Sequence, residues 1–443
     1  MRFFMKRAIE DLKSVGINVA NILVPNNGVD LTKWAIVACD QYTSELDYWQ
    51  RVEKFVDTAP STLHLIYPEV YLEEENGKQR IAKIQNTMEN YLGQNLFDNY
   101  DESLFLIERT TVEGVSRWGL LVTLDLELYD YNNASKTPIR ATEGTIIERI
   151  PPRQAIRRGA KLELPHILVL IDDEERSVIE PLIALHQDLP KVYDFSLMEG
   201  GGHIKGYQVK STHLFTQLGK ALAKMGSKLD PSNPLMYAMG DGNHSLATAK
   251  ACWQEIKQKL SPAERETHPA RWAMVELENI YDEGLLFEPI HRILFNCSST
   301  LFLEELGHHC HLKSLETVES VEAIKGLIED QSLQRFGYVD REGFKVATLQ
   351  SPETSIVAGT IQNVIDALLE DEKGVEVDYV HGEEITTTLG SKEGNIGLFL
   401  PAIDKHTFFS TIVQDGSLPR KTFSMGHAQE KRFYLEARKI VSD

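Results

Sequence analysis

The spacing of apolar residues along the chain predicts a protein that combines strands and helices. Two apolar stretches, residues 104–108 and 118–129, flank a glycine turn at 112–114 and predict an antiparallel hairpin. Residues 166–171 form an apolar run followed by two aspartates, which is typical of a buried strand. The spacing of a helix with one apolar face is clearest in residues 79–92, 178–186, 214–225, 246–260, 321–329, 361–369 and 428–440.

The order of these elements favours a mixed α/β fold, an α+β mixed sheet, over a purely parallel one. Strands and helices do not alternate one to one, and the predicted hairpin is antiparallel. The 443 residues are enough for two or three domains. After about residue 296 the sequence becomes more acidic and more helical. We therefore expect a core domain over residues 1–296 and a second, more helical α/β lobe over 297–443 that contributes to the site.

Composition and charge narrow the classes of partner. The sequence contains 42% hydrophobic and 25% charged residues, as globular proteins do. Its 46 basic and 66 acidic residues give a net charge of −20, which opposes non-specific binding to nucleic acid or to an anionic membrane. The four cysteines lack the spacing of a metal site, and no apolar run reaches about 18 residues. We expect a cytoplasmic protein in which any site for an anion is local.

The segment with the most informative chemistry is a polar turn between an apolar run and a helical pattern. The turn consists of Gly240, Asp241, Gly242, Asn243, His244 and Ser245. A helix that begins here directs its first N–H groups and its positive dipole end at the turn, where an anion would bind. Asp241 could bind a metal or act as a base, and His244 could carry a proton. The alternative is that these are ordinary turn and cap residues.

A second segment, residues 140–161, is basic within an acidic chain. It contains six basic residues against Glu143 and Glu148, a local excess of four positive charges. If a helix begins near Pro152, Arg153 and Arg157 lie on one face, a spacing suited to gripping phosphate oxygens. Glu143 precedes this helix in a turn and could activate a hydroxyl group. The alternative is a surface helix whose arginines pair with acidic residues elsewhere in the chain.

A third segment, residues 416–427, leads into the helix predicted for 428–440. Lys421, Thr422 and Ser424 could contact a substrate anion or close over the main site. The alternative is a packing role, in which aromatic residues such as Phe433 and Tyr434 dock a C-terminal helix.

Seven motifs in order along nearly the whole chain resemble the domain-of-unknown-function family 1015 (DUF1015). They lie at residues 34–44, 142–153, 164–173, 240–250, 287–292, 378–383 and 418–426. The family is similar to the ParB/sulfiredoxin superfamily, which implies a ParB/sulfiredoxin-like core that binds nucleotide phosphates at a helix start. Relatives in that superfamily include kinases that act on free serine with ADP or ATP. Walker A, dinucleotide-binding, His-Glu-x-x-His and Gly-x-Ser-x-Gly motifs do not occur in the sequence.

The resemblance assigns roles to particular residues. Asp241, Gly242 and His244 match the Asp-Gly-His-His-Arg turn common in the family, and Glu143 matches a glutamate that precedes its arginine-bearing segment. Two positions depart from that pattern, because Asn243 replaces a histidine and Ser245 replaces the arginine. The missing charge would then come from a basic residue elsewhere, for which the candidates are Arg149, Arg153 and Lys421.

Together these observations favour a nucleotide-dependent phosphotransferase that acts on a small hydroxylated metabolite such as a free amino acid. Glu143 would orient or deprotonate the hydroxyl, Asp241 would hold Mg²⁺, and His244 with the Gly240–Ser245 turn and nearby basic residues would balance phosphate charge. The expected cofactors are ADP or ATP with Mg²⁺, and these residues should share one pocket. The alternative is a non-catalytic sensor of a nucleotide or metabolite.

Overall fold

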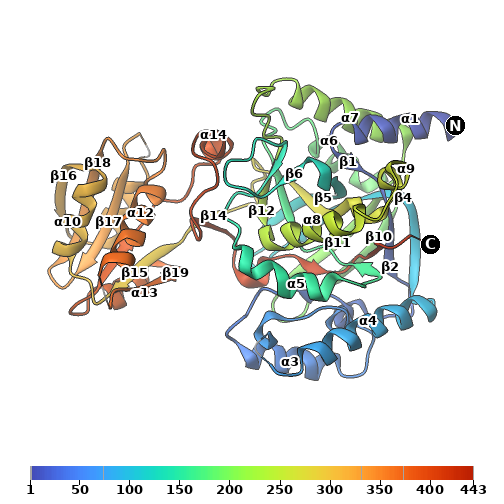
Figure 1. Cartoon of the computed structure of the whole chain (residues 1–443), viewed down its shortest axis with the longest axis horizontal. Coiled ribbons are helices and arrows are strands. Elements are labelled where there is room, and N and C mark those ends of the chain that lie inside the picture. Colours follow the sequence, from blue (N-terminus) through green and yellow to red (C-terminus); the bar gives the residue numbers. More distant parts are fainter. Residues whose placement is uncertain (1, 73, 331, 373, 443) are drawn as a thin grey trace. The chain divides into compact units, whose positions relative to one another are not determined.

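The computed structural model describes residues 2–72, 74–330, 332–372 and 374–442 (Figure 1). The chain divides into two units. The first unit comprises Met1–Ala141, Thr145–Leu285 and Gly426–Asp443, and the second comprises Thr142–Gly144 and Leu286–Met425. The division therefore falls eleven residues before the expected boundary after residue 296, and residues 426–443 belong to the first unit instead of the second.

The first unit is built on a large mixed sheet. Its strand order is β10-β11-β4-β5-β13-β9-β12-β7-β6, with β1 on β5 and β2 on β4. The strands are β1 (Ile17–Asn18), β2 (Ala20–Pro25), β4 (Phe97–Thr110), β5 (Ser116–Asp125), β6 (Tyr129–Asp130), β7 (Ile139–Arg140), β9 (Leu168–Ile171), β10 (Lys191–Ser196), β11 (His203–Val209), β12 (Tyr237–Asp241) and β13 (Trp272–Asn279). Most pairs are antiparallel, whereas β9 runs parallel to β13 and β7 runs parallel to β12 and β6. The expected mixed α+β class is confirmed.

Helices cover this sheet on both faces because its central strands are apolar on both sides. In β4, Phe105 and Ile107 face one hydrophobic core, whereas Leu104 and Leu106 face the other. The helices of the first unit are α1 (Arg2–Lys13), α2 (Leu31–Trp34), α3 (Leu46–Val56), α4 (Gly77–Gly93), α5 (Ile150–Arg157), α6 (Glu180–Ile183), α7 (Thr212–Gly226), α8 (Asn243–Lys257) and α9 (Pro262–Thr267). Among the residues described, no helix combines the length and apolar character needed to cross a bilayer.

The second unit contains a smaller antiparallel sheet in the order β16-β18-β17-β20-β15-β19, and a separate pair, β14-β21. Its strands are β14 (Phe287–Pro289), β15 (His291–Phe295), β16 (His311–Val318), β17 (Arg335–Asp340), β18 (Gly343–Gln350), β19 (Glu376–Val380), β20 (Ile396–Phe399) and β21 (Phe423–Met425). Its helices are α10 (Ser299–His309), α11 (Val321–Ile328), α12 (Val357–Asp371), α13 (Glu383–Gly390) and α14 (Lys405–Asp415). The helices predicted for 321–329 and 361–369 correspond to α11 and α12.

Local patterns predicted the elements of the first unit unevenly. The predicted hairpin is confirmed, because β4 and β5 pair with Glu108 opposite Trp118. The predicted buried strand is β9, and three predicted helices correspond to α4, α7 and α8. The segment 178–186 is helical only at α6 and in a short turn that follows, and Pro181 lies in the first turn of α6.

The prediction of a helix over residues 428–440 is wrong. This segment forms a 3-10 turn at Ala428–Glu430 and two short strands, β22 (Phe433–Tyr434) and β23 (Arg438–Lys439). β22 pairs with β3 (Ile36–Val37), and β23 pairs with β8 (Leu162–Glu163). Residues 432–438 are all buried, polar and apolar alike, so the segment has no solvent face such as a surface helix requires.

A buried ion-pair network fixes this C-terminal segment. Arg432 Nη1 lies 2.7 Å from Glu276 Oε2, and Arg432 Nη2 lies 2.7 Å from Glu436 Oε2. All three side chains are at most 3% exposed. The hydroxyl of Tyr193 donates a hydrogen bond to Glu436. Removing the arginine would leave two buried carboxylates without their partner.

We expect Arg432→Met to lower the free energy of unfolding by about 3–5 kcal/mol, because it leaves those buried carboxylates without a cationic partner. Urea unfolding followed by tryptophan fluorescence measures the change. Arg51→Met is the control in the same unit, since the Arg51 side chain is 54% exposed and pairs with Asp47 at the surface. It should cost far less than Arg432→Met, because solvent screens an exposed ion pair. Equal losses in the two variants would contradict the structural role given to Arg432.

Candidate functional site

The turn between β12 and α8 presents Asp241 at the end of a central strand. The register of β12 against β9 shifts between Met239 and Asp241, so Gly240 lies at an irregularity of the strand. Gly242 follows with φ +83°, and a Cβ atom there would lie 3.1 Å from Ile167. Both constraints favour glycine at position 242. Asn243, His244 and Ser245 then form the first turn of α8, so the helix begins three residues before the predicted start at 246.

Asp241 is held by a cation and by the turn itself. Its Oδ1 accepts a hydrogen bond from the N–H of Gly242 at 2.9 Å, and its Oδ2 lies 3.3 Å from Lys431 Nζ. The Asp241 side chain is 24% exposed and that of Lys431 is 11% exposed. Burial alone would raise the pKa of Asp241, but Lys431 and His166 outweigh it and lower that pKa. Asp241 is therefore a carboxylate at neutral pH.

His166 connects Asp241 electrostatically with a second acidic group. It is buried, its ring centroid is 5.1 Å from that of Tyr434, and its charge would favour the ionised forms of both Asp241 and Glu69. Burial raises the pKa of Glu69, Arg153 opposes that shift, and Asp40 adds to it. We call these groups the Asp241 cluster, which consists of Asp40, Glu69, Arg153, His166, Asp241 and Lys431.

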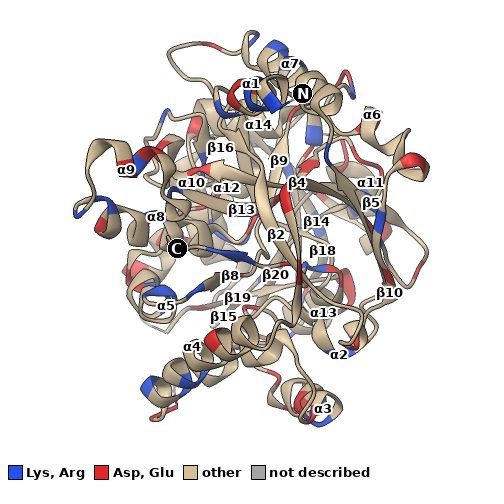
Figure 2. Ribbon diagram, turned by 90° about the vertical axis from the view of Figure 1, so that its right-hand side faces the viewer, with Lys and Arg blue, Asp and Glu red and all other residues tan. Residues whose placement is uncertain are grey.

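The arginines of α5 have carboxylate partners, and Figure 2 shows the basic residues of this helix in blue. Arg153 and Arg157 of α5 pair with Glu69 and Glu163, and Arg158, directly after the helix, pairs with Glu255. The Glu163 carboxylate is buried, which would raise its pKa, but Arg438 and Arg157 outweigh burial and lower it to about 2. In this structure the arginines of α5 form ion pairs with acidic residues elsewhere in the chain, which was the alternative to a phosphate-binding role. Arg153 alone among these pairs belongs to the Asp241 cluster.

His244 is anchored by the segment that leads into α5. Its Nε2 accepts a hydrogen bond from the N–H of Ile146 at 3.2 Å. That bond requires an unprotonated Nε2, so the neutral ring carries its proton on Nδ1. The hydroxyl of Thr248 donates to the His244 carbonyl, and the N–H of Ser245 donates to the Gly242 carbonyl. The first turn of α8 is thus held by hydrogen bonds within the helix and by a hydrogen bond to the segment before α5.

Two of the predicted site residues belong to the second unit. Glu143 forms an isolated bridge with Leu418, where the N–H of Leu418 donates to the carbonyl of Thr142 at 2.7 Å. Burial lowers the pKa of the fully buried Arg292 to about 10, while Glu143 opposes that shift. Lys421 is exposed, with φ +60°, and Arg149 of the first unit is also exposed. A shared pocket for Glu143 and Asp241 stays a prediction.

Three members of the Asp241 cluster were missed by the sequence interpretation. Lys431 and Glu69 were given no role, and His166 lay only within the motif at residues 164–173. Residues 420–439 contain six basic residues against two acidic ones, which is a local signal near Lys431, but nothing in the sequence shows that these groups meet. They come from segments far apart in the chain and are joined only by folding.

The predicted Mg²⁺ role of Asp241 has little support in this environment. The described residues contain no group of three His, Cys, Asp or Glu side chains placed to hold a metal ion. Both oxygens of Asp241 already have partners, one of them a cation that would repel Mg²⁺. The residues present do not fit a metal site of the protein's own. We therefore assign no chemical step to Mg²⁺ here.

The lowered pKa of Asp241 predicts how acid affects stability. Because the folded pKa lies below the unfolded one, this carboxylate stabilises the fold at neutral pH, and its contribution is lost as the pH falls below about 4. We expect Asp241→Asn to cost about 1–3 kcal/mol at pH 7, since Lys431 loses its partner. The same variant should lose less stability than the wild type on acidification.

Thermal or urea unfolding at a series of pH values measures both effects. Asp47→Asn is the control, because the Asp47 side chain is 78% exposed. A variant Asp241→Asn with the same acid dependence as the wild type would show that Lys431 and His166 do not stabilise the charge of Asp241.

Comparison with known proteins places the sequence in a family. Residues 23–368 match the family described as "Protein of unknown function (DUF1015)". No curated protein matches the sequence.

Three solved structures illustrate the level of structural similarity. A free serine kinase mutant in complex with ADP is 11% identical, with a TM-score of 0.39, over 72% of this chain and 92% of that one. A conserved hypothetical protein from Pyrococcus furiosus is 11% identical, with a TM-score of 0.35, over 72% and 95%. SbnI from Staphylococcus aureus with a C-terminal truncation is 10% identical, with a TM-score of 0.34, over 71% and 82%. These values are too low to transfer an activity.

Proposed function

The chain belongs to the DUF1015 family, whose function is unknown, and on that premise we propose that it is a nucleotide-dependent phosphotransferase. Its substrate would be a small hydroxylated metabolite, and its donor ADP or ATP. The reaction site would include the Asp241 cluster at the start of α8. The observation that carries the proposal is the Asp241–Lys431 pair beside His166, at the N-terminus of a 15-residue helix.

This arrangement is suited to holding phosphate oxygens. A helix N-terminus favours negative charge. The ammonium group of Lys431 has three N–H donors, and its contact with Asp241 occupies one of them. The 3.3 Å separation of Lys431 from Asp241 is longer than that of a tight charge-assisted hydrogen bond. Lys431 can therefore contact a phosphate oxygen without losing Asp241. Asp241 acts as a positioning residue that holds Lys431 at the helix start.

The proposed reaction transfers the terminal phosphoryl group of the nucleotide. The bond between this phosphorus and the bridging oxygen breaks, and a bond to the acceptor oxygen forms, while the acceptor's hydroxyl proton passes to a carboxylate. Lys431 and His166 would balance charge on the group in transit, which is the main demand of such reactions on a protein. Glu143 keeps its predicted role as the carboxylate that orients or deprotonates the hydroxyl.

Turnover tests the proposal directly. We expect the protein, incubated with ADP or ATP, Mg²⁺ and hydroxylated metabolites, to yield a phosphorylated product detectable by mass spectrometry. Free serine is the first acceptor to try, because the resemblance described above suggests it. Lys431→Met should weaken nucleotide binding about tenfold or more, since it removes a charge-assisted contact. Glu143→Gln should abolish turnover and leave nucleotide binding largely intact.

The control is Arg158→Ala, which removes an exposed arginine that pairs with Glu255 outside the Asp241 cluster. It should behave as the wild type. Stabilisation by nucleotide without any product would favour the alternative, a nucleotide sensor. If the protein forms no product and binds no nucleotide, both the phosphotransferase and the sensor proposals are refuted.

A further inference from the structure

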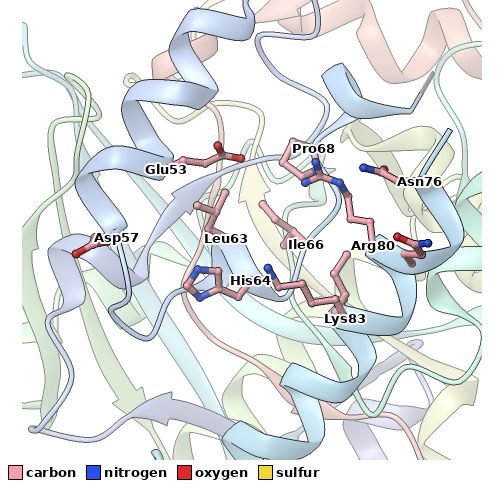
Figure 3. Close-up of a pocket in the computed structure, with 11 residues that line it drawn as sticks. Glu53, Asp57, Leu63, His64, Ile66, Pro68, Asn76, Arg80 and Lys83 are labelled. Carbon is pink, nitrogen blue, oxygen red and sulfur yellow. The ribbon is translucent and has the colours of Figure 1, made fainter. Parts of the chain in front are cut away.

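A pocket of about 480 Å³ lies in the first unit between α3, α4 and the segment that joins them (Figure 3). Its volume is within the range of small-molecule sites in proteins, roughly 300–1,000 Å³. The lining residues lie on α3, on α4 and in the segment between these two helices. None of them is a member of the Asp241 cluster.

The pocket has an acidic side and a basic side. Glu53 of α3 and Asp57 just after it supply the acidic side, whereas Arg80 and Lys83 of α4 supply the basic side. Figure 3 shows His64 between Asp57 and Lys83, with Leu63 and Ile66 above it. Among the described residues, no ion pair joins either acid to either base across the pocket. The opposite charges thus remain separated and face a shared space.

Several of these side chains are held in place by the protein. The guanidinium group of Arg80 lies 4.1 Å from the ring centroid of Tyr71 and pairs with Glu74. The Tyr71 hydroxyl donates to Glu53 Oε1 at 3.1 Å, which fixes that carboxylate. His64 Nδ1 lies 2.9 Å from the Tyr91 hydroxyl. Burial of His64 and the charge of Lys83 lower the pKa of His64, which keeps the ring neutral at physiological pH.

Lys83 stands apart from its neighbours on the basic side. Its ammonium group has no carboxylate partner within 4.0 Å in the described part of the chain, although acidic residues outnumber basic ones 66 to 46 in the sequence. Arg80, by contrast, is already paired. Lys83 is therefore available for an anionic group of a ligand, and the carboxylates of the opposite side are suited to a cationic group.

We propose that this pocket binds an amino acid in its zwitterionic form, with an apolar side chain. Lys83 contacts the carboxylate of the ligand, and Glu53 with Asp57 contacts the ammonium group. Leu63, Ile66 and Ile84 contact the side chain of the ligand, since they supply the apolar part of the lining. The site is distinct from the proposed phosphotransferase site, and the inference does not rest on that function.

Binding measurements with L-leucine and two analogues test the charge requirement. L-leucine amide lacks the carboxylate, and N-acetyl-L-leucine lacks the ammonium group. By isothermal titration calorimetry on the full chain, we expect L-leucine to bind and each analogue to bind about tenfold more weakly. Failure of both L-leucine and L-phenylalanine to bind would overturn the proposal. So would equal affinity for L-leucine and its amide.

Matched variants assign each charge to its contact. In Lys83→Met, L-leucine should bind about as weakly as its amide does, because the contact to the carboxylate is lost. In Glu53→Gln, the preference for L-leucine over N-acetyl-L-leucine should fall instead. Lys78→Met is the control on the same helix, because Lys78 is exposed and outside the pocket lining. Unchanged discrimination in both test variants would place the ligand elsewhere.

One more variant separates this pocket from the Asp241 cluster. Asp241→Asn should leave the affinity for L-leucine unchanged. Loss of binding in that variant would mean that the amino acid occupies the Asp241 cluster, which would overturn the assignment of the pocket without bearing on phosphoryl transfer.

Discussion

The packing of residues 426–442 against the rest of the first unit is the interaction on which the candidate site depends. The N–H groups of Leu23 and Ala437 each donate to the other's carbonyl, and Phe433–Tyr434 pairs with β3. Arg432 anchors the segment in a buried ion-pair network. This docking delivers Lys431 to Asp241, a residue distant in the sequence. Without the segment, Asp241 would lose the cation that lies nearest to its carboxylate.

Charge in this protein is organised by pairing. In a chain with a net charge of −20, Arg153, Arg157 and Arg158 are neutralised by Glu69, Glu163 and Glu255, so they do not form an open basic surface. Each of the two proposed sites contains a lysine with donors left for a ligand. Lys431 has donors beyond its contact with Asp241, and Lys83 has no acidic partner among the described residues. A short stretch of chain connects them, since Pro68 lines the pocket and Glu69 belongs to the Asp241 cluster.

Sequence patterns predicted best where the structure is local. The β4–β5 hairpin, the buried strand β9 and the turn from β12 into α8 depend on neighbouring residues, and all three are present. The same reasoning was wrong for residues 428–440, whose helical spacing of apolar residues is overridden by pairing with β3 and β8. Strand pairing with distant partners leaves no periodic signal in a segment this short.

The sequence by itself determined the mixed fold class, the family and the placement of Asp241 and His244 at a helix start. It did so because turn chemistry and apolar spacing act over a few residues. Only the tertiary structure decided which charges meet. Lys431 and His166 act on Asp241, while Glu69 interacts with His166 and pairs with Arg153, because strands and loops from distant parts of the chain converge there. Electrostatic interactions depend on the distance between charges in the folded structure, and the number of residues between two charges in the sequence does not indicate that distance.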